Sequence, residues 1–257
     1  MIRVERRDAG IVWVTVDRPA ARNAMTFAMW ARLREVAHEL DADPSVRVVV
    51  LTGAGGEAFV AGTDIAEFRA FTGADDGVAY EARIDATIGA LDAIRVPVIG
   101  AIAGACTGGG VSIAATCDLR VGAPNVRIGI PIARTLGNIV SLRNVARVAD
   151  LIGLDAAKAL LITGRLIDAG AALRVGFLNE LVDDGAALPT RAQTLAESIA
   201  GLAPLTVRAS KEIARRIRAS RTLPDAEDLI RMCYGSRDFR EGLTAFLDKR
   251  RPEWTGS

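Results

Sequence analysis

Two short segments of the sequence have residue types that suit the polarisation of a carbonyl group. The first is residues 58–65, AFVAGTDI, and the second is residues 104–112, GACTGGGVS. Each has the small residues of a turn that can present a free backbone N–H group. Two such groups that converge on one point would hold the oxygen of a thioester as it becomes negative, which is the chemistry of an oxyanion hole.

The second segment has a serine, Ser112, where chemistry at a thioester usually needs a carboxylate. No Asp or Glu then occurs between Leu119 and Ala149. Because a hydroxyl group alone is a poor base near neutral pH, Ser112 would either orient a water or an acyl group, or simply pack in a buried helix. The remaining candidates for a proton-transfer group are His38, Asp64, Glu67, Glu81 and Asp85.

Two of these candidates have a plainer interpretation. His38 is the only histidine and lies among Arg34, Glu35 and Glu39, which predicts a solvated helix face. Asp64 lies near the end of the first of these segments, and its position predicts a cap for the next helix.

Alternating strands and helices must position these segments. Hydrophobic patterns predict strands over 11–16, 46–52, 98–103 and 118–122, and helices over 26–40, 76–94 and 110–116. This alternation indicates an α/β fold with right-handed crossovers. After residue 188 the patterns predict only helices, over 190–202, 204–219 and 224–239. We therefore divide the chain into an α/β core, residues 1–188, and a helical region, residues 189–257.

The balance of charges bears on which partners to expect. The chain has 257 residues, and 32 Lys and Arg balance 31 Asp and Glu to a net charge of +1. This balance gives no reason to expect nucleic acid or a membrane surface as a partner. A local basic patch stays open, because five arginines fall in the stretch without carboxylates: Arg120, Arg127, Arg134, Arg143 and Arg147.

Three cysteines without a CxxC spacing argue against a disulfide framework and against a zinc site. The first ten residues contain no apolar segment of a secretory signal, so we expect a cytoplasmic protein. The uncharged stretch 96–117 is long enough to cross a bilayer, but Pro97 and its glycines favour a buried strand, a loop and a buried helix.

A dinucleotide site is an open alternative. Residues 53–58, GAGGEA, match G-x-G-x-x-[GA] after a predicted strand. That motif should open a helix directly, whereas residues 59–62 read as a continuing loop. The alternative predicts a nicotinamide-dependent oxidoreductase, which a dinucleotide titration would detect.

Several motifs together resemble the enoyl-CoA hydratase/isomerase, or crotonase, superfamily over nearly the whole chain. They are DRP at 17–19, RNAM at 22–25, FVAGTDI at 59–65, TGGG at 107–110, CDLR at 117–120 and AFLDKRRP at 245–252. The resemblance implies a spiral of ββα units, a C-terminal helical region that builds homotrimers or hexamers, and an acyl-CoA thioester as substrate with no further cofactor.

The resemblance also implies site residues. The oxyanion donors would be the N–H groups of Thr63 and Gly109. Substrate-binding positions that follow from the same motifs are Ala24, Ala61, Asp64, Ile65 and Gly108, and Arg22, whose guanidinium suits a CoA phosphate or else stays solvated.

This chain departs from the family pattern where the two usual glutamates are expected. Ser112 takes the first place, and Ile132, in the segment GIPI at 129–132, takes the second. Residues 137–141, GNIVS, are similar to a stretch of hydroxycinnamoyl-CoA hydratase-lyases, so Asn138 and Arg134 are candidate polar groups of the acyl pocket.

Beside the dinucleotide alternative, two functions remain open within this family. One is an enzyme that hydrates, dehydrates or isomerises an acyl-CoA through an enolate, with slow hydration of crotonyl-CoA. The other is a non-catalytic acyl-CoA-binding or scaffolding protein.

Overall fold

A computed structural model describes residues 1–257 and contains two β-sheets. The larger sheet has six strands in the order β1-β2-β3-β5-β7-β10, parallel except for β1 against β2. Its strands are β1 (Ile2–Arg6), β2 (Ile11–Val16), β3 (Val48–Gly53), β5 (Val98–Ile102), β7 (Leu119–Gly122) and β10 (Glu180–Leu181). The smaller sheet has four strands in the order β4-β6-β8-β9: β4 (Ala58–Val60), β6 (Ala105–Thr107), β8 (Arg127–Gly129) and β9 (Ile167–Asp168).

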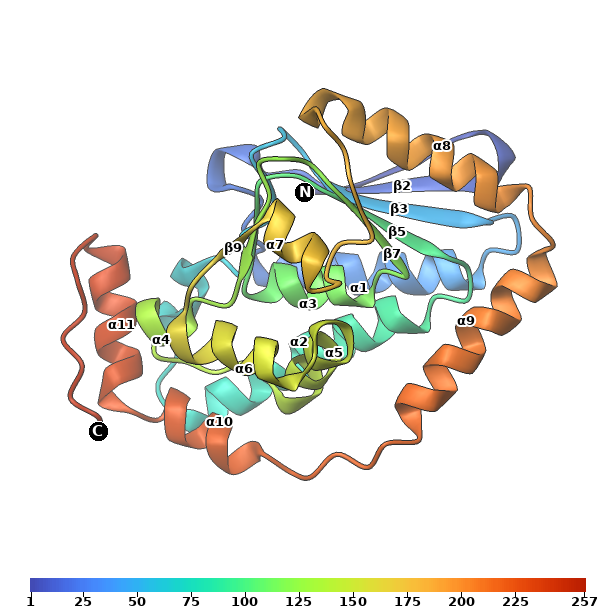
Figure 1. The fold of residues 1–257 in the computed structure, drawn as a ribbon. Helices are drawn as coiled ribbons and strands as arrows, with labels where there is room; N and C mark the ends of the chain where they lie inside the picture. The colour runs from blue at the N-terminus through green and yellow to red at the C-terminus, as the bar shows by residue number, and fades with distance from the viewer.

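The chain alternates between the two sheets in a repeating ββα unit. Successive pairs β3–β4, β5–β6 and β7–β8 each give their first strand to the larger sheet and their second to the smaller one. Helices α1 (Phe27–Ala42), α2 (Ala74–Ala93) and α3 (Gly109–Thr116) lie below the larger sheet in the view of Figure 1. The expected α/β spiral is therefore confirmed.

Helix boundaries follow local capping. Helix α1 begins after Thr26, whose side chain accepts a hydrogen bond of 3.2 Å from the Met29 amide, as the sequence predicted. Sequence patterns missed a set of short elements between β4 and β10: the 3₁₀ helix η3 (Ile65–Ala70) and helices α4 (Ile132–Thr135), α5 (Leu142–Ile152), α6 (Leu154–Thr163) and α7 (Ala169–Arg174).

The C-terminal region contains four helices where the sequence predicted three. They are α8 (Leu188–Ala200), α9 (Pro204–Ala219), α10 (Glu227–Tyr234) and α11 (Arg237–Leu247). The predicted helix over 224–239 was wrong, because Ser236 starts a new helix by accepting a 3.0 Å hydrogen bond from the Phe239 amide.

These helices pack in different places. Helix α8 covers the upper face of the larger sheet (Figure 1), and its buried side chains Leu188, Ala192 and Ala196 join the strand residues in a separate core cluster. Helix α9 leads away from the sheet, and α10 and α11 return to lie beside α2 and α4. The core boundary at residue 188 stays a prediction.

The apolar stretch 96–117 forms the expected strand β5 and buried helix α3, and the expected loop between them contains the short strand β6. None of the helices combines the length and the apolar composition that a bilayer crossing requires. The five arginines do not form one surface patch, because Arg120, on β7, is buried and Arg147 lies 3.5 Å from Asp92 in an ion pair.

Candidate functional site

A cavity of about 470 Å³ lies where the segments that follow β4 and β6 meet α2, α3 and α11. It gathers residues from distant parts of the sequence. All predicted site residues except Arg134 line it, namely Arg22, Ala24, Ala61, Thr63, Asp64, Ile65, Gly108, Gly109, Ser112 and Asn138. Arg134 is exposed on α4 and does not line this cavity.

The two glycine-containing segments lie side by side in this cavity. Strands β4 and β6 are parallel neighbours, so the segments that follow them leave the same edge of the sheet. A Cβ atom on Gly62 would stand 3.8 Å from the Gly109 nitrogen and 3.3 Å from the Thr107 carbonyl oxygen. Neither the Thr63 amide nor the Gly109 amide donates a hydrogen bond to a protein carbonyl in these loops. Both donors are therefore available to a ligand.

One aromatic side chain supports both amides. Trp30 donates a hydrogen bond of 3.0 Å from Nε1 to Thr63 Oγ1, and Tyr80 Oη lies 2.6 Å from the same oxygen. The indole ring of Trp30 also packs against Gly109, since a Cβ atom there would stand only 2.8 Å from the ring. Helix α1 thus fixes the relative position of the two donors through Trp30.

The loop that precedes α1 is held to the first donor segment by polar contacts. Arg18 pairs with Asp64 at 2.7 Å, and Asp64 also caps η3 by accepting a 3.1 Å hydrogen bond from the Ala66 amide. The predicted capping role of Asp64 is confirmed. Arg22, in a left-handed conformation, lines the cavity, is exposed and makes no ion pair, so its guanidinium is free for an anionic ligand.

Asn23 is the buried centre of this loop. Its side chain donates hydrogen bonds of 2.9 Å and 2.7 Å to the carbonyls of Ala54 and Ala58, and accepts one of 2.9 Å from the Arg18 amide. The residue is fully buried and has a φ of 56°, a conformation that Asn tolerates better than most residues. Asn23 therefore ties the binding loop to both ends of the turn between β3 and β4.

Asn23→Ala is expected to destabilise the protein by about 2–4 kcal/mol, because it leaves buried backbone groups without partners. Urea unfolding of the two proteins measures this difference. Arg22→Ala is the matched control, since the neighbouring side chain has the same left-handed backbone but is exposed and unpaired. Equal unfolding midpoints for wild type and Asn23→Ala would contradict the assigned role of the Asn23 amide.

Two polar atoms of the residues that line the cavity have no protein partners. Ser112 is 1% exposed on α3, and its Oγ makes no hydrogen bond. Asn138 donates a 3.0 Å hydrogen bond from Nδ2 to Tyr234 Oη, while its Oδ1 makes none. Ile132 also lines this end. Both orphan atoms are therefore free to bind a polar group of a ligand.

Of the candidate proton-transfer groups His38, Glu67, Asp85 and Glu81, one lines the cavity. His38 is exposed, as predicted, and Glu67 accepts a 3.1 Å hydrogen bond from the Phe27 amide outside the cavity. Asp85 is hydrogen-bonded to Ser141 at 2.6 Å and does not line the cavity either. Glu81, on α2, lines the cavity together with Thr63 and Gly109 and is only 4% exposed.

Glu81 is held by two partners from later parts of the chain. Tyr234 Oη donates a 2.8 Å hydrogen bond to Oε1, and the Ser141 amide donates one of 2.9 Å to Oε2. Burial raises the pKa of this carboxyl to about 7 against the opposing effect of both hydrogen bonds. Sequence reasoning named Glu81 only as one of several candidates, although a carboxylate within the apolar stripe of Tyr80, Ile84 and Ile88 was a signal.

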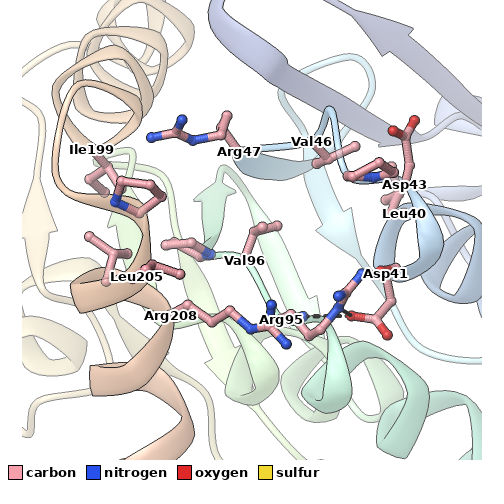
Figure 2. Close-up of a pocket in the computed structure, with 14 residues that line it drawn as sticks. Leu40, Asp41, Asp43, Val46, Arg47, Arg95, Val96, Ile199, Leu205 and Arg208 are labelled. Atoms are coloured by element: carbon pink, nitrogen blue, oxygen red, sulfur yellow. Dashed lines mark hydrogen bonds and ion pairs between the residues drawn. The ribbon is translucent and has the colours of Figure 1, made fainter.

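A second hollow, of about 200 Å³, lies between the start of α9 and the ends of α1 and β5 (Figure 2). Several of its charged groups already have partners. Arg95 binds Asp41 at 2.9 Å, and Arg47 donates to the carbonyls of Ala200 and Leu202. It contains none of the predicted site residues, so the larger cavity is the candidate active site.

Comparisons with known proteins identify the family of this chain. The family model described as enoyl-CoA hydratase/isomerase matches residues 6–257. A probable enoyl-CoA hydratase of Mycobacterium bovis is 34% identical over 254 residues, covering 97% of this chain and 96% of that protein. A short-chain-enoyl-CoA hydratase of Clostridium acetobutylicum is 32% identical over 250 residues, covering 96% of this chain and 95% of that one.

Solved structures give the same result. An enoyl-CoA hydratase/carnithine racemase from Magnetospirillum magneticum has a TM-score of 0.80 and 34% identity, covering 100% of this chain and 96% of that one. A methylmalonyl-CoA decarboxylase in complex with 2-nitronate-propionyl-CoA has a TM-score of 0.89 and 25% identity, covering 100% and 98%. The match of fold, motifs and nearly full length shows that this chain belongs to the enoyl-CoA hydratase/isomerase family.

Proposed function

We propose that this protein binds an acyl-CoA thioester and holds its carbonyl oxygen between the amides of Thr63 and Gly109, so that an enolate can form. The observation that carries this proposal is the close approach of the two segments, whose amides have no protein acceptor. The dipole at the start of α3 adds positive potential at the Gly109 amide. One oxyanion donor typically contributes ~10² to 10³ in rate.

The rest of the cavity suits the same ligand. Arg22 at its mouth supplies a free guanidinium for a CoA phosphate, with Ala24, Ala61, Ile65 and Gly108 as neighbours along the CoA arm. Apolar side chains at the other end, including Phe68, Ile84 and Leu136, suit an acyl group. A related decarboxylase binds a CoA thioester analogue, which supports this ligand class.

The reaction proposed is hydration, dehydration or double-bond migration of the acyl group. Ser112 and Ile132 stand in the places of the two glutamates that typical hydratases of the family use, so this enzyme is atypical. Crotonyl-CoA hydration is therefore expected to be slow relative to the best substrate. No cofactor besides the CoA thioester is required in this proposal, and the setting proposed is fatty acid metabolism in the cytoplasm.

A second candidate function is non-catalytic acyl-CoA binding, favoured by the uncharged side chains at positions 112 and 132. Calorimetric titration with butyryl-CoA, followed by assays with enoyl-, 3-hydroxyacyl- and malonyl-type CoA esters, separates the two. Binding with turnover of at least one ester supports the enzyme, and binding without turnover of any ester supports the second function. Absence of butyryl-CoA binding would refute both.

We also propose that the protein assembles into a homotrimer or a hexamer. The C-terminal and connecting helices expose large apolar side chains, among them Leu205 at 78%, Ile217 at 67% and, on α6, Ile162 at 71%. A second copy that covers these side chains would remove them from water. Analytical ultracentrifugation of the purified chain measures the assembly, and a monomer at micromolar concentration would refute this proposal.

A further inference from the structure

We propose that Glu81 is the catalytic residue that transfers the substrate proton, presented from α2 in place of carboxylates at positions 112 and 132. This inference rests on the proposed function, because it requires an acyl-CoA in the cavity. Among the residues that line the cavity, the carboxylates are Asp64 and Glu81. Asp64 is engaged in the cap of η3 and in the ion pair with Arg18, which leaves Glu81 for proton transfer.

Helix packing places this carboxyl in the cavity. Gly77 lies one turn before Glu81, and a Cβ atom on it would stand 2.2 Å from the ring of Tyr234. The missing side chain lets α10 approach α2 closely enough for the Tyr234 hydroxyl to bind Glu81. The Ser141 amide, at the start of α5, binds the other oxygen. Three elements therefore hold the carboxyl group in one orientation.

A second observation indicates a polar ligand at this end. Ser112 Oγ and Asn138 Oδ1 are buried, line the same cavity and have no hydrogen-bond partner. Buried polar atoms normally have partners, so an unpartnered pair in a cavity is a place for a water molecule or a substrate hydroxyl. The Asn138 side chain also donates a hydrogen bond to Tyr234, which in turn binds Glu81.

One carboxylate is sufficient for both proton transfers of the reaction. In hydration, ionised Glu81 takes a proton from water while the water oxygen bonds to the β-carbon, and the electron pair of the double bond moves to the thioester oxygen. The protonated Glu81 then gives its proton to the α-carbon as the enolate collapses. Water has been added, and the carboxylate is restored; dehydration is the reverse of these steps.

Titratable groups on the elements that pack around Glu81 influence the ionisation of its carboxyl group. Asp85 and Tyr80 on α2, and Tyr234 on α10, face Glu81, while Arg143 and Arg147 on α5 lie near Asp85. The Tyr234 hydrogen bond stabilises the ionised form of Glu81 and lowers its pKa. Activity through ionised Glu81 should therefore rise with pH through the pKa of this carboxyl.

The test compares Glu81→Gln with Glu67→Gln on whichever of crotonyl-CoA, 3-hydroxybutyryl-CoA and 3-butenoyl-CoA the wild type converts fastest. Glu81→Gln is expected to lower kcat by ~10² to 10⁴ while butyryl-CoA binding is retained. Glu67→Gln makes the same change outside the cavity and keeps an acceptor for the Phe27 amide, so it should keep kcat within roughly threefold. A third variant, Tyr234→Phe, should move the acidic limb of the kcat profile up by about one pH unit, which a merely structural role would not do.

Each outcome decides the matter. Loss of turnover in Glu81→Gln with retained butyryl-CoA binding supports the inference. A kcat within tenfold of wild type in Glu81→Gln overturns it and leaves the oxyanion hole intact. A wild type that binds butyryl-CoA but converts no ester also overturns it, whereas failure to bind butyryl-CoA refutes the proposed function itself.

Discussion

The substitution Gly110→Ala is expected to lower kcat/KM by ~10² to 10³, because it forces the two oxyanion segments apart. A Cβ atom on Gly110 would stand 2.0 Å from the carbonyl oxygen of Val60, and both are fixed main-chain positions. Val60 ends β4, which leads to Thr63, and Gly110 lies in the first turn of α3 next to Gly109. Steady-state kinetics on the best acyl-CoA substrate measures the effect.

Gly89→Ala is the matched control for this substitution. Gly89 lies in α2 with no atom within 4 Å of an added Cβ, so alanine should raise stability by about 0.5–1 kcal/mol and leave kcat/KM unchanged. If Gly110→Ala does not fold, Trp30→Phe tests the same geometry. It removes the Nε1–H bond to Thr63 and should lower kcat by roughly 3- to 10-fold. Unchanged kinetics in a folded Gly110→Ala would refute the oxyanion hole.

The second large effect is a dependence of the free energy of unfolding on pH, which we expect from Glu81. The folded state raises the pKa of Glu81 from 4.5 to about 7, chiefly because burial disfavours the charged carboxylate. The folded protein therefore binds a proton more tightly than the unfolded chain does. Stability from this group is fully present below pH 4.5 and is lost as the pH rises towards 7. The loss amounts to about 3 kcal/mol, at 1.36 kcal/mol for each pKa unit.

Glu81→Gln should remove this dependence, because the amide carries no charge at either pH. Urea unfolding at pH 5 and at pH 8 measures the free energy of unfolding of both proteins. We expect the wild type to lose about 2.5 kcal/mol more than the variant between the two values, because a small part of the loss has already occurred at pH 5. An equal change in both proteins would mean that Glu81 titrates as it does in the unfolded chain.

The sequence was most informative where one element carries its own pattern. Strand β2 was predicted with its observed bounds from an apolar run, and α9 from Pro204 at a helix start. The three-residue strands β4, β6 and β8 could not be predicted, because strands of that length are too short to show a period. Their parallel pairing is nevertheless what brings residues 63 and 109 together.

In the candidate site, too, locally determined features could be predicted, whereas features that depend on distant contacts could not. The glycine-containing segments that line the cavity and the cap at Asp64 depend on local residue types, so both could be predicted from the sequence. The position of Glu81 depends on contacts with Tyr234 and Ser141, far along the chain. Arg134 was predicted to lie in the pocket from its place near the segment 137–141. Its position on α4 exposes the side chain instead.

The seating of Tyr234 against Gly77 has a consequence for the newly made protein. The cavity receives Tyr234's hydrogen bond and the Phe246 ring only from the last helices of the chain. Nearly the entire polypeptide must therefore be synthesised before the cavity is complete. Premature termination after α9 would yield a product with both amide donors but without the tyrosine that orients its carboxyl group.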